Sequence, residues 1–418
     1  MNKLIFIGNF VNDTIVNHKD LSISREQSFH DLLKSCETSR ELNNTNVERN
    51  TALGGSVTYG SLASAAFGGT TSYIVTNLGT DIDDQYNRLI CNDSQRGCIS
   101  TQYVAPSATP NTAYQLNYYN NKKNRTLLLM EKGKRIDSAQ CMQCLREQQP
   151  DAVFFVPVAD EIDTDLIMDV LDGMKSLKTK PIIAFDIQGL LRTFVGTKVT
   201  TRPKDVMIER LKLIGNKLNA DGFVSILKSE YGEAVAIVGD GHTDPATCSK
   251  LIRTEFGFTF SSVTMGGDGG FISSSTTGEV YIPTFKPEVV KDETGCGDTF
   301  LTCTILELLT TLSNKKKMTG TQNNASVAND SAPPVSAEDD VLGALGLTRD
   351  EIIHCIEVGS AGASFLVEQI GPNGFANRDR IIDRVTNGQR QAKSTYLQFN
   401  SPDQSARPSK PPKSTTHY

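Results

Sequence analysis

The sequence predicts an α/β fold with a mostly parallel central sheet. Short runs that are apolar throughout alternate with helix-like segments over most of the 418 residues. Strands that are apolar on both faces are typical of a parallel sheet covered by helices on both sides. The predicted strands are residues 3–8, 71–78, 152–158, 181–186, 222–227 and 261–265. The predicted helices include residues 60–67, 163–177 and 205–219.

Three segments interrupt this alternation and look like additions to the core. Residues 18–50 are polar and charged, and residues 314–340 are of low complexity, so we expect insertions there and a disordered loop in the second. The tail over 386–418 is rich in Gln, Ser, Pro and Lys, and no packed structure is expected from Gly388 onward.

Residues 113–130 predict a β-hairpin with strands 114–119 and 125–130, which could form a lid over a site.

Composition narrows the classes of partner. The net charge of −6 and the lack of Trp give no basic, base-stacking surface, so we expect no nucleic acid partner. The apolar run within residues 1–10 is too short to span a membrane and predicts a buried strand, so no membrane partner is expected either. Nine scattered cysteines, including the single Cys-x-x-Cys of Cys141 and Cys144, indicate reduced thiols and a cytoplasmic location.

The most informative motif is Asp292-Glu-Thr-Gly-Cys-Gly-Asp298. It follows a β-type run over 278–285 and opens a helical pattern over 299–312. A small-residue turn at a helix start presents unpaired backbone N–H groups at the positive end of the helix dipole, which favours an anion. A carboxylate beside that anion suits a general base, although Asp298 taken alone fits a helix cap equally well.

This motif resembles the C-terminal signature of the pfkB (ribokinase-like) carbohydrate and nucleoside kinases. Residues 53–56 (Leu-Gly-Gly-Ser) with 77–81 resemble the N-terminal signature of that family, and residues 263–270 and 359–363 resemble its nucleotide-side segments. The resemblance implies a ribokinase-like three-layer αβα fold with a small β lid, as one kinase domain over residues 1–385. Short strings at 8–13, 185–192 and 227–230 are most similar to plant-type myo-inositol kinases.

The resemblance also implies site residues. Asp298 would be the base and the amides of Gly295, Cys296 and Gly297 would hold the transferring phosphoryl. The substrate would bind at Asp13, Gly54, Gly55, Ser56 and Asp298. The nucleotide would bind at Thr264, Gly266, Gly269, Thr294, Gly297, Ser360, Ala361 and Ala363. A phosphate and metal network would comprise Asp186, Gln188, Arg192, Glu230 and Glu233, with Glu233 reaching the metal through water.

The implied reaction is transfer of the γ-phosphoryl of ATP, with Mg²⁺ and a monovalent cation as candidate cofactors, to a hydroxyl of a small polyol or sugar. Inositol, a pentose, a ketohexose and a nucleoside stay open as acceptors, in that order. The oligomeric state stays open, with a homodimer as one candidate, because lids of this family sometimes pair between subunits. The alternative of another class is a catalytically silent ligand-binding or regulatory protein. Residues 8–13 do not fit the dinucleotide-binding glycine pattern, which argues against an oxidoreductase.

Three departures from the family pattern bear on these predictions. Tyr59 stands where many members have a sugar-binding Asn, Cys296 where they have Ala, and Glu230 where they have Asn. Cys296 is either an inert or a redox-sensitive thiol. Structural roles stay open for several other residues: a cap for Asp13, a salt bridge for Arg192, and a surface helix start for Glu230 with Glu233.

Overall fold

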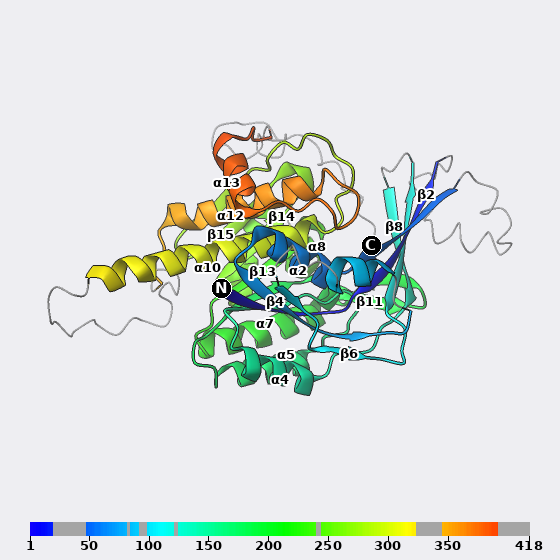
Figure 1. Cartoon of the computed structure of the whole chain (residues 1–418), viewed down its shortest axis with the longest axis horizontal. Helices are drawn as coiled ribbons and strands as arrows, with labels where there is room; N and C mark the ends of the chain where they lie inside the picture. Colours follow the sequence, from blue (N-terminus) through cyan, green and yellow to red (C-terminus); the bar gives the residue numbers. More distant parts are fainter. Residues whose placement is uncertain are drawn as a thin grey trace.

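The computed structural model describes residues 1–19, 47–81, 84–91, 98–120, 124–239, 244–322 and 345–391. It contains a large twisted sheet with helices on both faces and a smaller sheet that projects beside it, seen with β2 and β8 in Figure 1. The predicted fold class is confirmed. Within the described ranges, no helix combines the length and apolar character that crossing a membrane requires.

The large sheet is parallel except at one edge, where β14, β15 and β16 pair antiparallel. Its strand order is β16 (Gly278–Ile282), β15 (Gly270–Ser274), β14 (Phe260–Thr264), β13 (Ser225–Glu230), β10 (Ile182–Asp186), β9 (Ala152–Phe155), β1 (Asn2–Ile7), β4 (Thr70–Leu78) and β5 (Cys98–Ser100), with β6 (Val104–Pro106) also on β4. All six predicted strands belong to it. The prediction for residues 222–227 was shifted, since β13 begins at Ser225 and runs on to Glu230.

Side chains of the central strands alternate between two hydrophobic layers. Phe6 and Phe154 stack with ring centroids 4.4 Å apart in one layer, and Phe155 and Phe185 stack at 4.9 Å in the other. The first layer packs under α2 (Ser56–Phe67), α10 (Cys296–Gln322), α12 (Arg349–Leu366) and α13 (Arg378–Asn387). The second packs under α4 (Ser138–Gln148), α5 (Thr164–Met174), α7 (Lys204–Ala220), α8 (Tyr231–Val238) and α9 (Pro245–Phe256).

Capping residues fix where several helices begin. The side chain of Asp163 accepts from Leu166 N ahead of α5, and Asp244 accepts from two amides ahead of α9, whose first residue is Pro245. Thr348 and Glu351 form a reciprocal capping box at α12. The short helical elements are α3 (Asp84–Tyr86), η2 (Asn87–Cys91), α6 (Gln188–Leu191) and η3 (Gly266–Asp268).

The predicted hairpin is present as β7 (Thr112–Tyr119) and β8 (Asn124–Glu131), but it is the middle of a six-stranded sheet. The other strands are β11 (Arg192–Val195), β12 (Lys198–Thr201), β2 (Val11–His18) and β3 (Val47–Gly54). The assignment of residues 18–50 as an insertion was therefore wrong at its ends, because His18 closes β2 and residues 47–50 open β3. The segment between them lies outside the described residues.

Two further predictions need correction. Residues 314–322 are not a loop, because α10 continues through Gln322 and the Lys315 ammonium lies 2.7 Å from the Glu351 carboxylate of α12. The rest of that segment, residues 323–340, falls outside the described ranges. The tail is packed as far as Gln391, because Arg390 forms a β-bridge with Phe285. Residues 392–418 are not described.

Candidate active site

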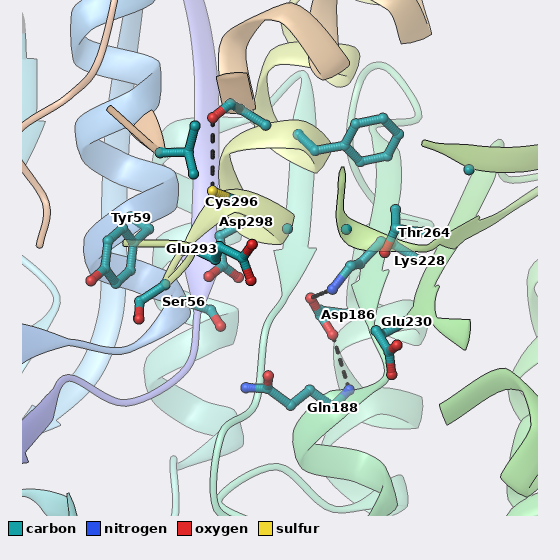
Figure 2. A pocket seen from close by; sticks show the side chains of 18 of the residues that line it. Ser56, Tyr59, Asp186, Gln188, Lys228, Glu230, Thr264, Glu293, Cys296 and Asp298 are labelled. Atoms are coloured by element: carbon teal, nitrogen blue, oxygen red, sulfur yellow. Dashed lines mark hydrogen bonds and ion pairs between the residues drawn. The ribbon is translucent and has the colours of Figure 1, made fainter. Parts of the chain in front are cut away.

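A cavity of about 480 Å³ lies between the two sheets, within the range of small-molecule sites. Three parallel strands end at it, since Asp186, Glu230 and Thr264 are the last residues of β10, β13 and β14. Open α/β sheets place their ligands at these carboxyl ends. Figure 2 shows Ser56 and Tyr59 on one side of Asp298, and Lys228 and Thr264 on the other.

The turn before α10 is held rigid from two sides. The Asp292 carboxylate accepts from Thr294 N and Gly371 N, both at 3.0 Å. Gly295 has φ +80°, and a Cβ at that position would overlap the Tyr59 ring. The first turn of α10 then presents its unpaired amides to the cavity. Cys296 N is partly engaged, because it donates to Glu293 O at 3.3 Å.

Asp298 lies in the first turn of α10, partly buried, with its side chain among the other residues that line the cavity (Figure 2). Burial, reinforced by the neighbouring Asp186 carboxylate, raises the pKa of Asp298 to about 7. Lys228, a hydrogen bond from Ser56, and Arg192 oppose that rise. A carboxylate with a pKa near neutrality is suited to accepting a proton from a hydroxyl group.

Lys228 is a central residue that the sequence prediction missed. Its ammonium lies 2.8 Å from Asp186 Oδ2, with both side chains buried, and Figure 2 draws this ion pair. A Cβ placed on Gly297 would lie 2.6 Å from Lys228 Nζ, so the ammonium lies directly against the small-residue turn. Burial alone would lower the pKa of Lys228, but the carboxylates of Asp186, Glu233 and Asp298 raise it above its usual value. The signal available in the sequence was a lysine directly after the mostly apolar run of residues 222–227.

The predicted phosphate and metal network surrounds this ion pair. Asp186 Oδ1 accepts from Gln188 N at 3.0 Å. Glu230 and Glu233 form a capping box at the start of α8, so they begin a helix as the structural alternative expected, but this helix start is not on the surface. Glu233 is nevertheless 3% exposed, and burial raises its pKa to about 7. Both glutamates line the cavity.

Arg192 does not form the salt bridge that was one of its two predicted roles, as far as the described residues show. Its guanidinium donates to Val158 O at 3.1 Å and lies 5.5 Å from the centroid of the Tyr114 ring. Tyr114 Oη donates to the same carbonyl at 2.7 Å. Arg192 and Tyr114 therefore join the second sheet to the rim of the first.

The end of the cavity under the second sheet holds Asp13, which is 8% exposed. Burial raises the pKa of Asp13 to about 7, although Arg125 and Arg192 act to lower it. Gly54 does not line the cavity; a Cβ there would overlap the Asp13 carboxylate, so Gly54 makes room for that side chain. The lining at this end also includes Val11, Gly55, Ser56, Tyr59, Tyr114, Leu116, Arg125 and Leu127.

The opposite end is largely apolar. It is lined by Gly266, Gly269, Ile272, Ile282, Thr284, Phe285, Ser360, Ala363, Val367 and Gln391. Ala361, predicted here, is instead a fully buried core residue of α12. Apart from Gly54 and Ala361, every predicted site residue lines this one cavity. Their roles stay predictions.

The Cys296 thiol lies close to the backbone of α12. Burial raises the pKa of the Cys296 thiol to about 12, and its Sγ lies 3.7 Å from Ala363 O, which favours the inert thiol. Among the described residues, no group of three or more His, Cys, Asp or Glu side chains could hold a metal ion unaided. The carboxylates of Glu230 and Glu233, which line the cavity, are oxygen donors of the kind that suits Mg²⁺ bound mainly by phosphates and water.

Comparison with known proteins shows similarity in structure and not in sequence. No protein-family model matches the chain, and no curated protein matches it. Giardia lamblia ribokinase superposes with a TM-score of 0.62 at 14% identity, covering 92% of this chain and 99% of that chain. Arabidopsis thaliana ribokinase, complexed with ribose and ATP, gives 0.57 at 15%, covering 92% and 99%. An archaeal nucleoside kinase of the ribokinase family, from Methanocaldococcus jannaschii, gives 0.54 at 14%, covering 92% and 98%. The chain therefore has the ribokinase-like fold.

Proposed function

We propose that this protein is an ATP-dependent kinase that transfers the γ-phosphoryl group to a hydroxyl of a small polyol or sugar. One observation carries the proposal: Asp298, with a pKa raised to about 7, directly follows a glycine turn against which the Lys228 ammonium lies. A base, unpaired amides and a fixed cation in one cavity are what phosphoryl transfer requires. The fold is that of kinases, which supports the proposal but does not by itself assign an activity.

In the proposed step, Asp298 accepts the proton of the acceptor hydroxyl. The hydroxyl oxygen bonds to the γ-phosphorus while the bond from that phosphorus to the β–γ bridging oxygen breaks, and ADP leaves with the bridging oxygen. Negative charge on the transferring group is stabilised by the amides of Gly295 and Gly297 and by Lys228. Asp186 holds the ammonium in place through its 2.8 Å ion pair.

The donor is assigned to the apolar end of the cavity. Small and apolar side chains of α12 and β15–β16 leave a slot for a flat base, and Thr264, Gly266 and Gly269 line the same cavity. Mg²⁺ supplies neutralisation of phosphate charge when bound with the nucleotide, and Glu233, through water, would hold it. The Arabidopsis ribokinase complex with ATP supports this choice of donor by likeness of fold.

The acceptor is assigned to the end with Asp13, beneath the second sheet. A carboxylate there can accept two hydroxyl hydrogen bonds, which suits a polyol. Tyr59 packs against Gly295 in place of the Asn of related kinases, which favours an acceptor other than ribose or fructose. We keep inositol, a pentose, a ketohexose and a nucleoside as candidate acceptors, in that order. Movement of the second sheet over the acceptor would exclude water and limit hydrolysis of ATP.

An ADP-release assay across a panel of polyols, sugars and nucleosides tests the proposal. Acceptor-dependent ADP release that requires Mg²⁺ is the expected result. Turnover with a nucleoside but not with inositol would remove the inositol assignment and keep the kinase. ATP binding without turnover on any acceptor would favour the alternative of a silent binding or regulatory protein on the same fold.

A further inference from the structure

The last described residues of the chain return to the donor end of the cavity. Residues 388–391, here called the strap, follow α13 and run antiparallel to residues 284–286. Lys286 N donates to Gln389 O at 2.8 Å, and Gln391 N donates to Thr284 O at 2.9 Å. The strap therefore adds a short β-ladder to the wall of the cavity, and Gln391 lines the cavity itself.

Side-chain contacts hold the strap in position. Arg390 Nη2 donates to Glu357 Oε1 of α12 at 2.7 Å, and the same guanidinium lies 5.2 Å from the centroid of the Phe285 ring. The backbone of Gln391 is thus fixed by a β-ladder on one side and by an ion pair with α12 on the other. A side chain on such a support can present its polar group to a ligand in one orientation.

The hydrogen bonds of Thr284 determine that orientation. Thr284 Oγ1 lies 2.8 Å from Gly267 O and 3.0 Å from Gln391 Oε1, so two oxygens face one hydroxyl group. A hydroxyl has one proton, and a backbone carbonyl can only accept, so the proton goes to Gly267 O. We therefore assign the carboxamide of Gln391 the orientation turned by 180°, in which Thr284 Oγ1 accepts from its –NH₂ and its carbonyl oxygen lies on the other side. That second position lies 3.9 Å from where a Cβ of Gly267 would be, beside another lining residue.

Other polar side chains at this end are already engaged. Ser360 Oγ donates to Pro283 O at 2.8 Å, and Ser364 Oγ donates to Ala361 O at 2.7 Å. Most of the remaining lining, including Ile272, Phe285 and Val367, is apolar. A base in an apolar slot is distinguished from other bases by the hydrogen bonds along its edge.

We propose that Gln391 selects the donor base by accepting a hydrogen bond from its exocyclic amino group. Adenine offers such a donor, whereas hypoxanthine has a carbonyl oxygen at the same place and would face the carboxamide oxygen with like partial charge. The inference rests on the proposed function, since it requires a nucleotide at this end of the cavity. Its recognition element is a residue of the strap, where no packed structure was expected from the sequence.

Calorimetric titration of the full-length protein with ADP and with IDP, both in Mg²⁺, tests this selection without any acceptor. We expect the wild type to bind ADP about 2- to 12-fold more tightly than IDP, the range of one net hydrogen bond. Gln391→Met keeps the size of the side chain and removes its oxygen, so the ratio should fall to about one. Gln389→Met is the matched control, because Gln389 contributes a backbone carbonyl to the strap, and it should retain the wild-type ratio.

The outcomes separate this inference from the function on which it rests. Equal affinity for ADP and IDP in the wild type, or a ratio unchanged in Gln391→Met, overturns base selection by Gln391 and leaves the kinase proposal standing. Binding of neither nucleotide, with turnover supported by pyrophosphate, overturns the nucleotide donor and the inference together. If the ratio of ADP to IDP affinity falls equally in Gln391→Met and Gln389→Met, the selection depends on the strap as a whole, and the specific role of Gln391 is overturned.

Discussion

The two sides of the cavity are built in different ways. Around Asp298, charged side chains are buried on the large sheet and on α10, and their positions follow from pairing between parallel strands, as in the Asp186–Lys228 register of β10 and β13. Around Asp13, the second sheet contributes aromatic and aliphatic side chains together with the charges of Asp13, Arg125 and Arg192. The first arrangement is costly to change, because an unpaired buried charge strongly destabilises a fold.

This difference suggests a division between reaction and substrate. Groups on the large sheet would set the chemistry for any acceptor, and groups on the second sheet would decide which acceptor is held. Substitutions on the large sheet and α10 should then change kcat, whereas substitutions on the second sheet should change the acceptor KM. The four predictions below test that separation, from the largest expected effect to the smallest.

Asp298→Asn should lower kcat by about 100-fold or more, because it removes the general base while preserving shape. The KM values for both substrates should change little. Steady-state kinetics with ATP and the best acceptor of the panel measures this. Asp165→Asn, an exposed site on α5, is the matched control and should behave as wild type. A near-wild-type kcat in Asp298→Asn would remove the base assignment.

Lys228→Met should lower kcat by about 100-fold, in the range found when one preorganised donor is removed from a charge-stabilising site. The loss should be the same for every acceptor that the enzyme uses, because Lys228 lies at the turn and not at the acceptor end. Since Asp186 is left buried without its cation, the double variant Lys228→Met with Asp186→Asn checks folding. A loss confined to one acceptor would contradict the division proposed above.

Asp13→Asn should raise the acceptor KM by about 10-fold or more, since hydrogen bonds to a charged group contribute about 1.5–3 kcal/mol. The KM for ATP should stay close to its wild-type value. Kinetics with each substrate varied in turn measures both constants. A change in the KM for ATP that matches the change for the acceptor would show that the two ends are not independent.

Features of the candidate site that depend on neighbouring residues could be predicted from the sequence. The turn over 292–298 and the start of α10 are local features, and their amides and carboxylate follow from a few consecutive residues. Lys228 could not be assigned in this way, because its partner Asp186 is 42 residues away and the pairing depends on strand register. The contact between Thr284 and Gln391 spans 107 residues and gives no local signal.

Of the second sheet, the sequence predicts only the hairpin of β7 and β8, for a related reason. Strand β2 carries Asn12, Asp13 and Asn17 among its apolar residues, and this mixture does not stand out as a strand without its partners. Its parallel partner β7 begins about a hundred residues later in the chain, so the pairing is invisible to a local pattern. The hairpin of β7 and β8 was found because its two strands are adjacent in sequence.

The smallest predicted effect concerns stability and pH. The pKa of Asp298 is raised from 3.8 to about 7 in the folded protein, so folding is favoured when this carboxyl is protonated. The protonated Asp298 carboxyl therefore adds to the free energy of unfolding below pH about 4, and this stabilisation is lost as the pH rises through about 7. Asp298→Asn removes that dependence, so the variant should melt above the wild type at pH 8.

We expect a difference of about 2 °C at pH 8, shrinking toward zero by pH 4, because side-chain exposure weakens the effect and a kcal/mol shifts the Tm of a large domain by a few degrees. Thermal unfolding without nucleotide, at pH 8, 6 and 4, measures it, with Asp165→Asn again as the control. A variant less stable than wild type at pH 8 would mean that Asp298 stabilises the fold as a helix cap. The same substitution thus separates the two roles that the sequence left open for Asp298: a cap loses stability when it is neutralised, whereas a base held for catalysis loses turnover and gains stability.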